Sequence, residues 1–201
     1  MKKKEVVERW ADPAFLLSLN PSIDRIFAEG APIRDVRLEG IDISYGSLEE
    51  LRHLGFDQRI IMNSDFSYSN FECSFYNSKV ESTSFHCCSF NGTNFKRSHV
   101  AKCVFTESVV KGGVCNDSVF EDCDFTGARL SDKSKLTLEF LRSRFVRCTF
   151  MDCFLDGVEL RAAAFHDCIF TGAKFTNSDF RGVKFLGSKP SADQFGVGCT
   201  R

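Results

Sequence analysis

Residues 171–185 read TGAKFTNSDFRGVKF, with phenylalanine at every fifth position. Counting in fives from Phe75 to Phe185 gives 23 positions, of which 22 are apolar and 15 are Phe. The positions two residues before these form a second series, which consists almost entirely of small residues such as Ala173 and Ser178. A repeat of five residues therefore organises most of this chain.

A period of five fits neither of the regular elements, because an α-helix repeats every 3.6 residues and a strand every two. The chain must turn at each repeat. Two inward positions in every five predict a solenoid with short extended sides, whose successive coils pair through backbone hydrogen bonds.

Three segments carry a resemblance to a known family: CDFTG at 123–127, AKFTN at 173–177 and SDFRG at 178–182. They resemble the A(D/N)Lxx consensus of the pentapeptide-repeat family, with Phe in place of the central Leu. The resemblance implies an all-β fold, a right-handed quadrilateral β-helix solenoid with four repeats, about twenty residues, per coil. At twenty residues per coil, one inward column should contain Phe85, Phe105, Phe125, Phe145, Phe165 and Phe185.

The repeat pattern divides the chain into four parts. We expect an N-terminal α-helical cap at 1–32, an irregular first coil at 33–63, the pentapeptide-repeat β-helix at 64–187 and a C-terminal tail at 188–201. A cap is expected because a solenoid end leaves backbone groups unpaired.

Two helices are predicted within the cap. Asp12-Pro13 and Asn20-Pro21 each place an N-cap residue before a proline at the first helical position, and Gly30 should end the second helix. The expected helical segment after Phe185, with which some family members form dimers, is missing from the sequence pattern, so monomer and homodimer both remain open.

Composition limits the classes of partner. The formal charge is -1, which gives no basic excess for direct binding to nucleic acid or to an anionic membrane. Lys2–Lys4 are followed by charged residues rather than by the apolar run of a signal peptide, and no apolar stretch is long enough to span a membrane. We therefore expect a soluble, cytoplasmic protein.

The ten cysteines are also consistent with a cytoplasmic protein. Most of them fall on the small-residue series, where Ser, Thr and Ala replace them, so we interpret them as small core residues with free thiols. Cys103 above Cys123, and Cys148 above Cys168, are the pairs close enough for a disulfide in an oxidising compartment.

The repeat fails in one region. Lys133 follows Gly113 and Lys135 follows Cys115 at a spacing of twenty residues, and a lysine cannot point into a dry core without a partner. Residues 131–137 should therefore bulge outward. Either the coil merely tolerates this bulge, or it marks a protein-binding surface formed by Lys111, Lys133, Lys135, Arg142, Arg144 and Arg147.

Two clusters invite a metal or nucleophile hypothesis: His86-Cys87-Cys88 and His166-Asp167-Cys168. They are four coils apart at twenty residues per coil, about 19 Å, so they cannot share a metal ion. We expect solvated histidines, no metal, no cofactor and no catalytic residues, since no nucleophile elbow, phosphate loop or dinucleotide fingerprint is present.

The pattern favours a non-enzymatic protein-interaction scaffold. The family includes Qnr-like and MfpA-like proteins that protect or inhibit DNA gyrase, so the resemblance implies a type II topoisomerase as the most specific partner. Residues 64–201 contain 17 basic and 16 acidic residues, a balance that disfavours imitation of DNA. The alternative is a secreted bacterial effector or an immunity-type protein that binds another protein, which the structured N-terminus disfavours.

Overall fold

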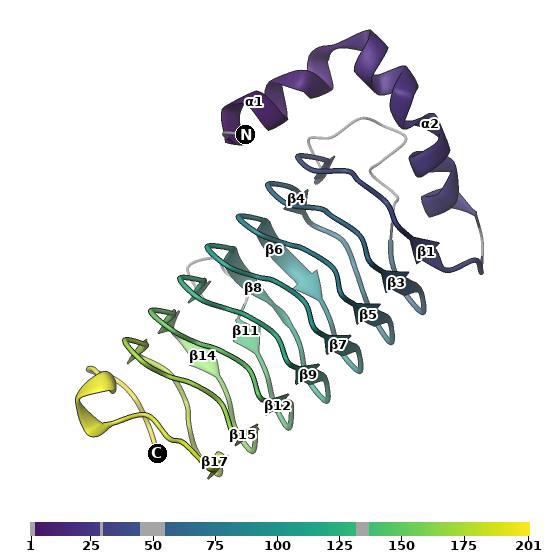
Figure 1. Cartoon of the computed structure of the whole chain (residues 1–201). Helices are drawn as coiled ribbons and strands as arrows, with labels where there is room; N and C mark the ends of the chain where they lie inside the picture. The colour runs from purple at the N-terminus through teal and green to yellow at the C-terminus, as the bar shows by residue number, and fades with distance from the viewer. Residues whose placement is uncertain (1–2, 29, 45–54, 132–136) are drawn as a thin grey trace.

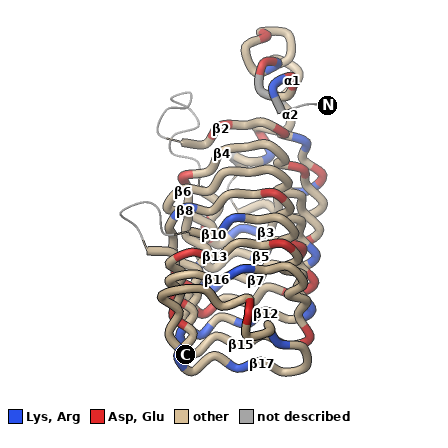
Figure 2. The backbone as a smooth tube through the Cα atoms, turned by 90° about the vertical axis from the view of Figure 1, so that its left-hand side faces the viewer, with Lys and Arg blue, Asp and Glu red and all other residues tan. Residues whose placement is uncertain are grey.

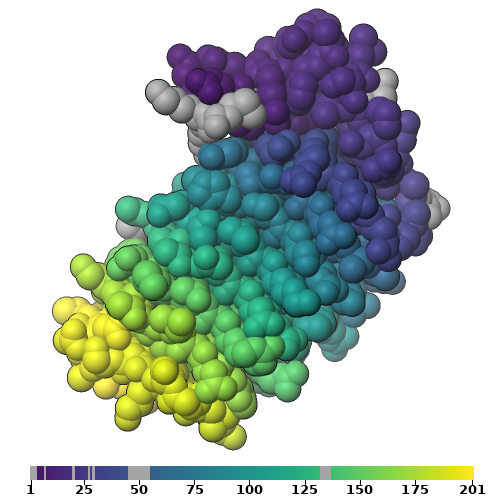
Figure 3. All heavy atoms as spheres, in the orientation of Figure 1, coloured from purple at the N-terminus to yellow at the C-terminus, as the bar shows by residue number. Residues whose placement is uncertain are grey.

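The computed structural model describes residues 3–28, 30–44, 55–131 and 137–201. It is a parallel β-solenoid that carries helices at its N-terminal end, with the coils stacked along one axis (Figure 1). The predicted all-β solenoid with a helical N-terminal cap is thus confirmed. In the space-filling view the two chain ends lie at opposite ends of an elongated body (Figure 3).

Two parallel sheets form two of the four sides. The 8-stranded sheet consists, in spatial order, of β1 (Ile33–Arg34), β3 (Ile60–Met62), β5 (Lys79–Glu81), β7 (His99–Ala101), β9 (Val119–Glu121), β12 (Arg144–Val146), β15 (Ala164–His166) and β17 (Lys184–Leu186).

The 9-stranded sheet faces the viewer in Figure 2. Its main path is β2 (Asp42–Ile43), β4 (Asn70–Phe71), β6 (Ser89–Asn94), β8 (Val109–Val114), β10 (Arg129–Ser131), β13 (Phe154–Asp156) and β16 (Lys174–Thr176), and β11 (Leu138–Glu139) and β14 (Val158–Glu159) lie beside this path.

The other two sides are narrower: a ladder of single parallel bridges forms the third, and the fourth combines single bridges with the ends of β6 and β8 and with β11 and β14. The third side runs through Arg37, Asp65, Ser84, Val104, Asp124, Thr149 and Ile169. The fourth side runs through Ser74, Asn94, Val114, Glu139, Glu159, Asp179 and Thr200. Because the chain turns one corner per five residues, the two sheets lie on opposite sides of the solenoid.

Residues at the corners adopt the left-handed backbone conformation. Asn77, Arg97 and Asp117 follow one another at the same corner in successive coils, with φ of 53°, 60° and 60°. Asn, Asp and Gly tolerate this conformation best. The frequent Asn, Asp and Gly of the repeat are therefore explained by the turns they make.

Phenylalanine rings fill the interior in stacked columns. Phe85, Phe105 and Phe125 stack on one another with centroids 5.1 and 4.9 Å apart and ring planes within 15°. Rings from neighbouring columns meet edge to face, as Phe120 and Phe125 do at 66°. Both arrangements are favourable for aromatic pairs, so the same residue type packs along the axis and across it.

The small-residue series lies buried beside these columns. Hydroxyls donate to carbonyl oxygens of the preceding coil, as Ser98 does to Phe75 (2.5 Å) and Ser118 to Phe95 (2.6 Å). Thiols take the same role at Cys123, which donates to Val100 (3.4 Å). All ten cysteines are free.

The register between coils corrects the predicted column of six phenylalanines. Phe150, rather than Phe145, stacks on Phe125, with centroids 5.1 Å apart and planes at 5°. Phe145 stacks on Phe120 and Phe165 in the adjacent column and meets Phe125 edge to face. The predicted column therefore joins two different columns.

The cause is one coil with five extra residues. Arg129 of β10 pairs with Val109, twenty residues before it, whereas Leu138 of β11 pairs with Gly113, twenty-five residues before it. One whole repeat is thus added between Ser131 and Leu138. Counting by fives stays in phase across it, while every later residue moves by one side.

This change of register also corrects the predicted neighbours of Gly113 and Cys115. Leu138 lies beside Gly113, and Cys115 donates its N–H to Glu139 (2.7 Å), so Leu138 and Phe140 continue the two inward columns that were assigned to the lysines. Lys133 and Lys135, and most of the predicted bulge, lie outside the described residues.

The N-terminal cap differs from its prediction in one respect. Helix α2 (Pro13–Phe27) begins as expected, with the Asp12 side chain accepting from the N–H of Ala14 (2.9 Å), but it runs through Pro21 instead of restarting there. Pro21 lacks the N–H that would bond to the Leu17 carbonyl, and Leu17 is 70% exposed. The helix ends at Phe27, before Gly30, and a short helix α1 (Lys3–Glu8) and a 3-10 turn (Arg9–Ala11) precede it.

Contacts between the cap and the first coil are specific. Val6, Leu19 and Ile26 are buried, and the indole N–H of Trp10 donates to the carbonyl of Glu39 (2.9 Å). From the coil, the Arg59 guanidinium donates to the carbonyls of Ile26 (3.1 Å) and Ala31 (2.9 Å). The cap therefore covers the N-terminal end of the core.

At the other end the chain continues to pair beyond residue 187. Phe195 bridges to Phe175 and stacks on it at 5.1 Å, and Thr200 bridges to Asp179. The Arg201 guanidinium lies over the Phe195 ring at 3.9 Å. A 3-10 turn (Ala192–Gln194) enters this last partial coil.

Removal of a ring from the middle of a column should cost more than removal from its end. We expect Phe150→Ala to lower the free energy of unfolding by about 3–5 kcal/mol, because the buried ring stacks on both Phe125 and Phe170. For Phe185→Ala, at the partly exposed end of its column, we expect less than about 2 kcal/mol. Urea unfolding followed by circular dichroism measures both; equal losses would contradict the column assignment.

Gly113 should be the least replaceable glycine of the solenoid. Its φ is +133°, and a Cβ there would collide with the backbone carbonyl of Thr93. We expect Gly113→Ala to cost at least about 3 kcal/mol. Gly182→Ala is the matched control, since its φ is +71° but the nearest atom would be 3.7 Å away, and we expect about 1–2 kcal/mol. Similar losses in urea unfolding would show that the Gly113 contact is unimportant.

Candidate interaction surface

The described members of the predicted basic surface do not lie together. Lys111 is on β8 in the 9-stranded sheet, whereas Arg144 is on β12 in the 8-stranded sheet on the opposite side. Arg142 and Arg147 occupy the corners before and after β12, with φ of 57° and 51°. The prediction of one surface that includes Lys111 and the three arginines is therefore wrong, because the extra repeat moves Arg144 by one side relative to Lys111.

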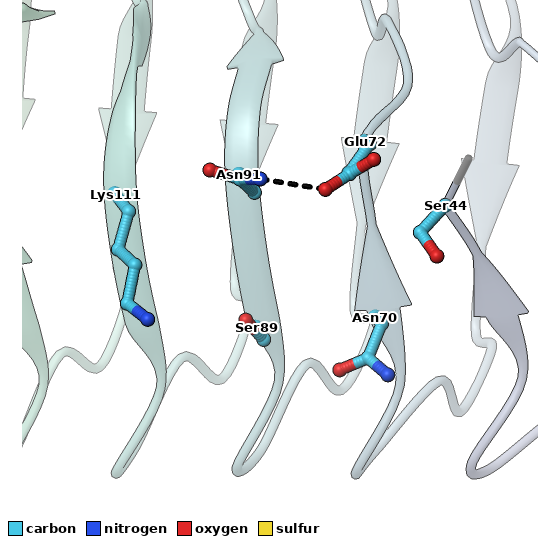
Figure 4. A pocket seen from close by; sticks show the side chains of 6 residues that line it. All are labelled: Ser44, Asn70, Glu72, Ser89, Asn91 and Lys111. Carbon is cyan, nitrogen blue, oxygen red and sulfur yellow. Dashed lines mark hydrogen bonds between the residues drawn. The ribbon is translucent and has the colours of Figure 1, made fainter. Parts of the chain in front are cut away.

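Lys111 lies at the end of a polar row on the 9-stranded sheet. Figure 4 shows it beside Asn91, whose side-chain amide donates to Glu72 (2.6 Å), with Ser44 further along. These residues border an open depression of about 370 Å³. The row is exposed and polar, without an enclosed site.

Arg142 and Arg147 are engaged in ion pairs with the preceding coil. Arg142 donates to both oxygens of Asp117 (2.7 and 3.0 Å), and Arg147 donates to Asp122 (2.7 and 2.9 Å) and to Glu121 (2.6 Å). These hydrogen bonds lower the pKa of each carboxyl and raise the pKa of both guanidinium groups. Both arginines therefore link adjacent coils through ion pairs, so a partner protein would have to compete with these carboxylates for them.

Charges are paired along the 8-stranded sheet as well. The Glu81 carboxylate lies 3.3 Å from the Lys79 ammonium and 3.7 Å from that of Lys102, and Glu121 lies 3.5 Å from His99. Arg144 makes no ion pair with a described residue. Basic and acidic residues follow one another down the right-hand edge of the stack in Figure 2.

The fourth side carries another paired group near the C-terminus. Asp179 accepts three hydrogen bonds from the Arg181 guanidinium, the shortest at 2.6 Å, and lies 3.6 Å from Arg161. The bond from Arg181 holds the pKa of this nearly buried carboxyl far below its usual range. Arg161 also lies 3.1 Å from Glu159. This side is therefore strongly charged but internally neutralised.

The third side differs from the other three. Its outward residues from the middle of the solenoid to the C-terminal coils are mostly uncharged, and we call them the threonine side: Val104, Thr106, Thr126, Thr149, Met151, Ile169 and Thr171. Ile169, on the last rung of the ladder, is 46% exposed, and Met151 is 38% exposed.

One carboxylate lies within the threonine side. Asp124 accepts from the N–H (2.9 Å) and the hydroxyl (2.6 Å) of Thr126, so its charge is satisfied locally. Charged residues lie at the two neighbouring corners instead, among them Asp122 and Arg147 on one and Glu107 and Asp152 on the other. An uncharged centre with a charged rim is the usual composition of a protein-binding patch.

The two histidine clusters also lie on different sides. His86 is on the third side and His166 is on β15 of the 8-stranded sheet, because the extra repeat lies between them. Within the described residues no three His, Cys, Asp or Glu side chains converge as a metal site would require. No helix among them is long and apolar enough to cross a membrane.

A small void marks the level at which the register changes. Val110, Cys115 and Leu130 take the place of phenylalanine there, and the surrounding rings leave about 20 Å³ unfilled. Its lining is entirely apolar, so it should remain dry. Stacked rings fill the described core on either side of this level, so the outer sides are the surfaces that a partner can reach.

Comparison with known proteins identifies the repeat. Residues 143–185 match the family model for pentapeptide repeats, in eight copies. This stretch consists of pentapeptide repeats. The same five-residue geometry extends through the coils on its N-terminal side, and the resemblance seen in the sequence is thereby confirmed. No curated protein sequence is significantly similar to the chain.

Solved structures with similarity to the chain are themselves repeat proteins. A trypsin-treated variant of QnrB1, a plasmid-mediated fluoroquinolone resistance protein, gives a TM-score of 0.46 at 17% identity, covering 83% of this chain and 79% of that one. Full-length QnrB1 gives 0.42 at 14% identity, covering 83% and 92%. HetL, a pentapeptide-repeat protein involved in the regulation of heterocyst differentiation in the cyanobacterium Nostoc, gives 0.25 at 12% identity, covering 85% and 93%.

The threonine side was missed in the sequence because its members are scattered at intervals of twenty or twenty-five residues. The signal is the pair of positions flanking each inward residue of one column, as Thr149 and Met151 flank Phe150. To find the threonine side, one must know how the coils pair across the extra repeat. A count at a constant twenty residues leads from Thr126 to Val146, which lies on the neighbouring sheet.

Proposed function

We propose that this pentapeptide-repeat protein is a non-enzymatic scaffold that binds another protein through the threonine side. The exposure of Ile169 and Met151 on a flat and nearly uncharged side is the observation that carries the proposal. Monomeric proteins bury most large apolar side chains of a sheet, and those left exposed together often mark a binding surface.

Desolvation favours this side over the other three. A partner that covers the 8-stranded sheet or the fourth side must remove water from charged pairs such as Arg147 with Asp122 or Arg181 with Asp179, which costs free energy that the new contacts must repay. Covering Thr149, Met151 and Ile169 removes water mainly from methyl and methylene groups. Threonine hydroxyls can still donate to a partner's backbone.

The filled interior supports a binding role over catalysis. Catalysis requires a concave site in which ionisable groups converge and water is excluded. The depression beside Lys111 is open, and its ionisable groups are exposed at the surface of the sheet. A rigid rod with flat sides is better suited to matching the surface of another macromolecule.

For the identity of the partner we propose DNA gyrase or another type II topoisomerase. The support is the resemblance of the repeats to Qnr-like proteins, together with the near-neutral charge of the chain. Imitation of DNA needs a strongly negative rod, so contact through an uncharged side is the form of binding that this chain favours.

A pair of matched substitutions tests the surface and the partner together. We expect the purified protein to protect gyrase in a supercoiling assay titrated with a fluoroquinolone, or to inhibit it without the drug. Ile169→Asp should weaken this effect about tenfold or more by placing a charge within the contact. Leu186→Asp is the control, because Leu186 is equally exposed, at 47%, but lies on the 8-stranded sheet.

The outcomes separate the two parts of the proposal. An effect on gyrase that Ile169→Asp and Leu186→Asp change equally would contradict the threonine side as the contact. No effect at any concentration would exclude gyrase as the partner. Thermal unfolding of both variants should match that of the parent within about 0.5 kcal/mol, because both positions are exposed.

A further inference from the structure

Cys87 and His86 form a pair at the corner between the third side and the 9-stranded sheet. The Cys87 Sγ lies 3.3 Å from the Nε2 of His86. The other ring nitrogen, Nδ1, lies 2.7 Å from the Thr106 hydroxyl in the next coil. A thiol, an imidazole within hydrogen-bond reach and a third group that fixes the ring are the components by which proteins activate a cysteine.

The other cysteines have different surroundings. The buried thiols contact backbone carbonyls, as Cys88 does at Phe66 (3.0 Å) and Cys148 at Phe120 (3.3 Å). Burial raises the pKa of Cys115 to about 12 and the pKa of Cys73 further still. Cys199 is partly exposed, as Cys87 is, but its thiol donates to the carbonyl of Phe175 (3.4 Å). Cys199 is therefore a natural comparison for Cys87.

The neighbours of the pair in adjacent coils are an aromatic ring and a carboxylate. Tyr68 meets the His86 ring edge to face, with centroids 5.4 Å apart and planes at 82°. Glu107 occupies the same corner one coil further on, and its carboxylate lies against Gly127 in the coil beyond, on the side away from Cys87. His86 is thus a titratable group in direct contact with the sulfur.

We propose that Cys87 is a reactive surface thiol, activated by His86 and modified by small disulfides. His86 accepts the thiol proton at Nε2 while Nδ1–H donates to Thr106, and the resulting thiolate attacks one sulfur of the disulfide. A new sulfur–sulfur bond forms to Cys87, the original bond breaks, and the other half leaves as a thiolate that takes up the proton. No additional oxidant is needed, since the disulfide itself is reduced.

Thr106 is a positioning residue in this scheme. In this scheme its hydroxyl accepts from Nδ1–H, which leaves the lone pair of Nε2 directed toward the sulfur. The proposal rests on the geometry of these three side chains and is independent of the partner that the threonine side binds.

Oxidised glutathione is the probe, with the full-length native protein and peptide mapping by mass spectrometry to locate the mixed disulfide. At pH about 7 we expect Cys87 to react at least ~10-fold faster than Cys199, because a histidine partner raises the thiolate fraction of a thiol whose ordinary pKa is about 8.5. Equal rates at the two cysteines would overturn the proposal.

His86→Asn is the decisive variant, since it keeps a polar side chain of similar size at a partly exposed position. We expect a ~10-fold slower reaction of Cys87 at pH about 7, and rates equal to the parent above pH about 9, where any exposed thiol ionises. The reaction of Cys199 should not change. A loss of Cys87 reactivity that persists at high pH, or no loss at all, would contradict activation by His86.

The pH–rate profile of the unmodified sequence provides a second test that needs no variant. Activation by His86 predicts that the rate at Cys87 rises less steeply between pH about 7 and about 9 than the rate at Cys199 does. Parallel profiles for the two cysteines would refute the pair. Thr106→Val should give an intermediate rate at Cys87, since it leaves the imidazole in place without its orienting partner.

Discussion

Parallel pairing between coils is the constraint on which the rest of the structure depends. Each coil donates backbone N–H groups to the next, as Phe85 does to Val104 (2.7 Å) and Phe105 to Asp124 (2.7 Å). Coils held at strand spacing place inward rings at a separation that suits stacking. The same pairing sets which outward side chains become neighbours. The core, the ion pairs and the composition of each outer side are therefore all consequences of the register.

Much of this register can be read from the sequence, because the interior accepts only two kinds of residue in fixed alternation. Phe at every fifth position and a small residue two positions earlier predicted the solenoid, the buried cysteines and the cap. The extra repeat could not be placed in the same way. A whole repeat preserves the count by fives, so Phe145 keeps its phase while it moves to the column of Phe120. The strand partner of Gly113 reveals the change of register, and that partner is known only from the three-dimensional structure. For the same reason the sequence grouped Lys111 with Arg144, although opposite sheets carry them.

The distribution of charge follows from the same shift. Arg142 and Arg147 reach carboxylates that precede them by twenty-five residues, at Asp117 and Asp122. If the coils were twenty residues long here, the two arginines would lie beside residues of different corners. These pairs join the two coils on either side of the register change, beside a core level where Val110, Cys115 and Leu130 pack less fully than phenylalanine. Exposed ion pairs contribute little individually, but here the geometry is bidentate, and it connects the coils where core packing is weakest.

The contrast between the sides then has a structural reason. Corners take Asn, Asp and Gly because the backbone is left-handed there, so charge gathers at the edges of every side. The flat centre of a side has no such requirement and is free to vary, and on the third side it carries threonine, methionine and isoleucine. β-Branched side chains such as Thr149 and Ile169 suit an extended ladder, which explains their presence but not the exposure of large apolar groups. Satisfying the fold needs only a β-compatible polar residue at Ile169, as Thr149 shows one coil earlier. The apolar choice at this position therefore exceeds what the fold demands.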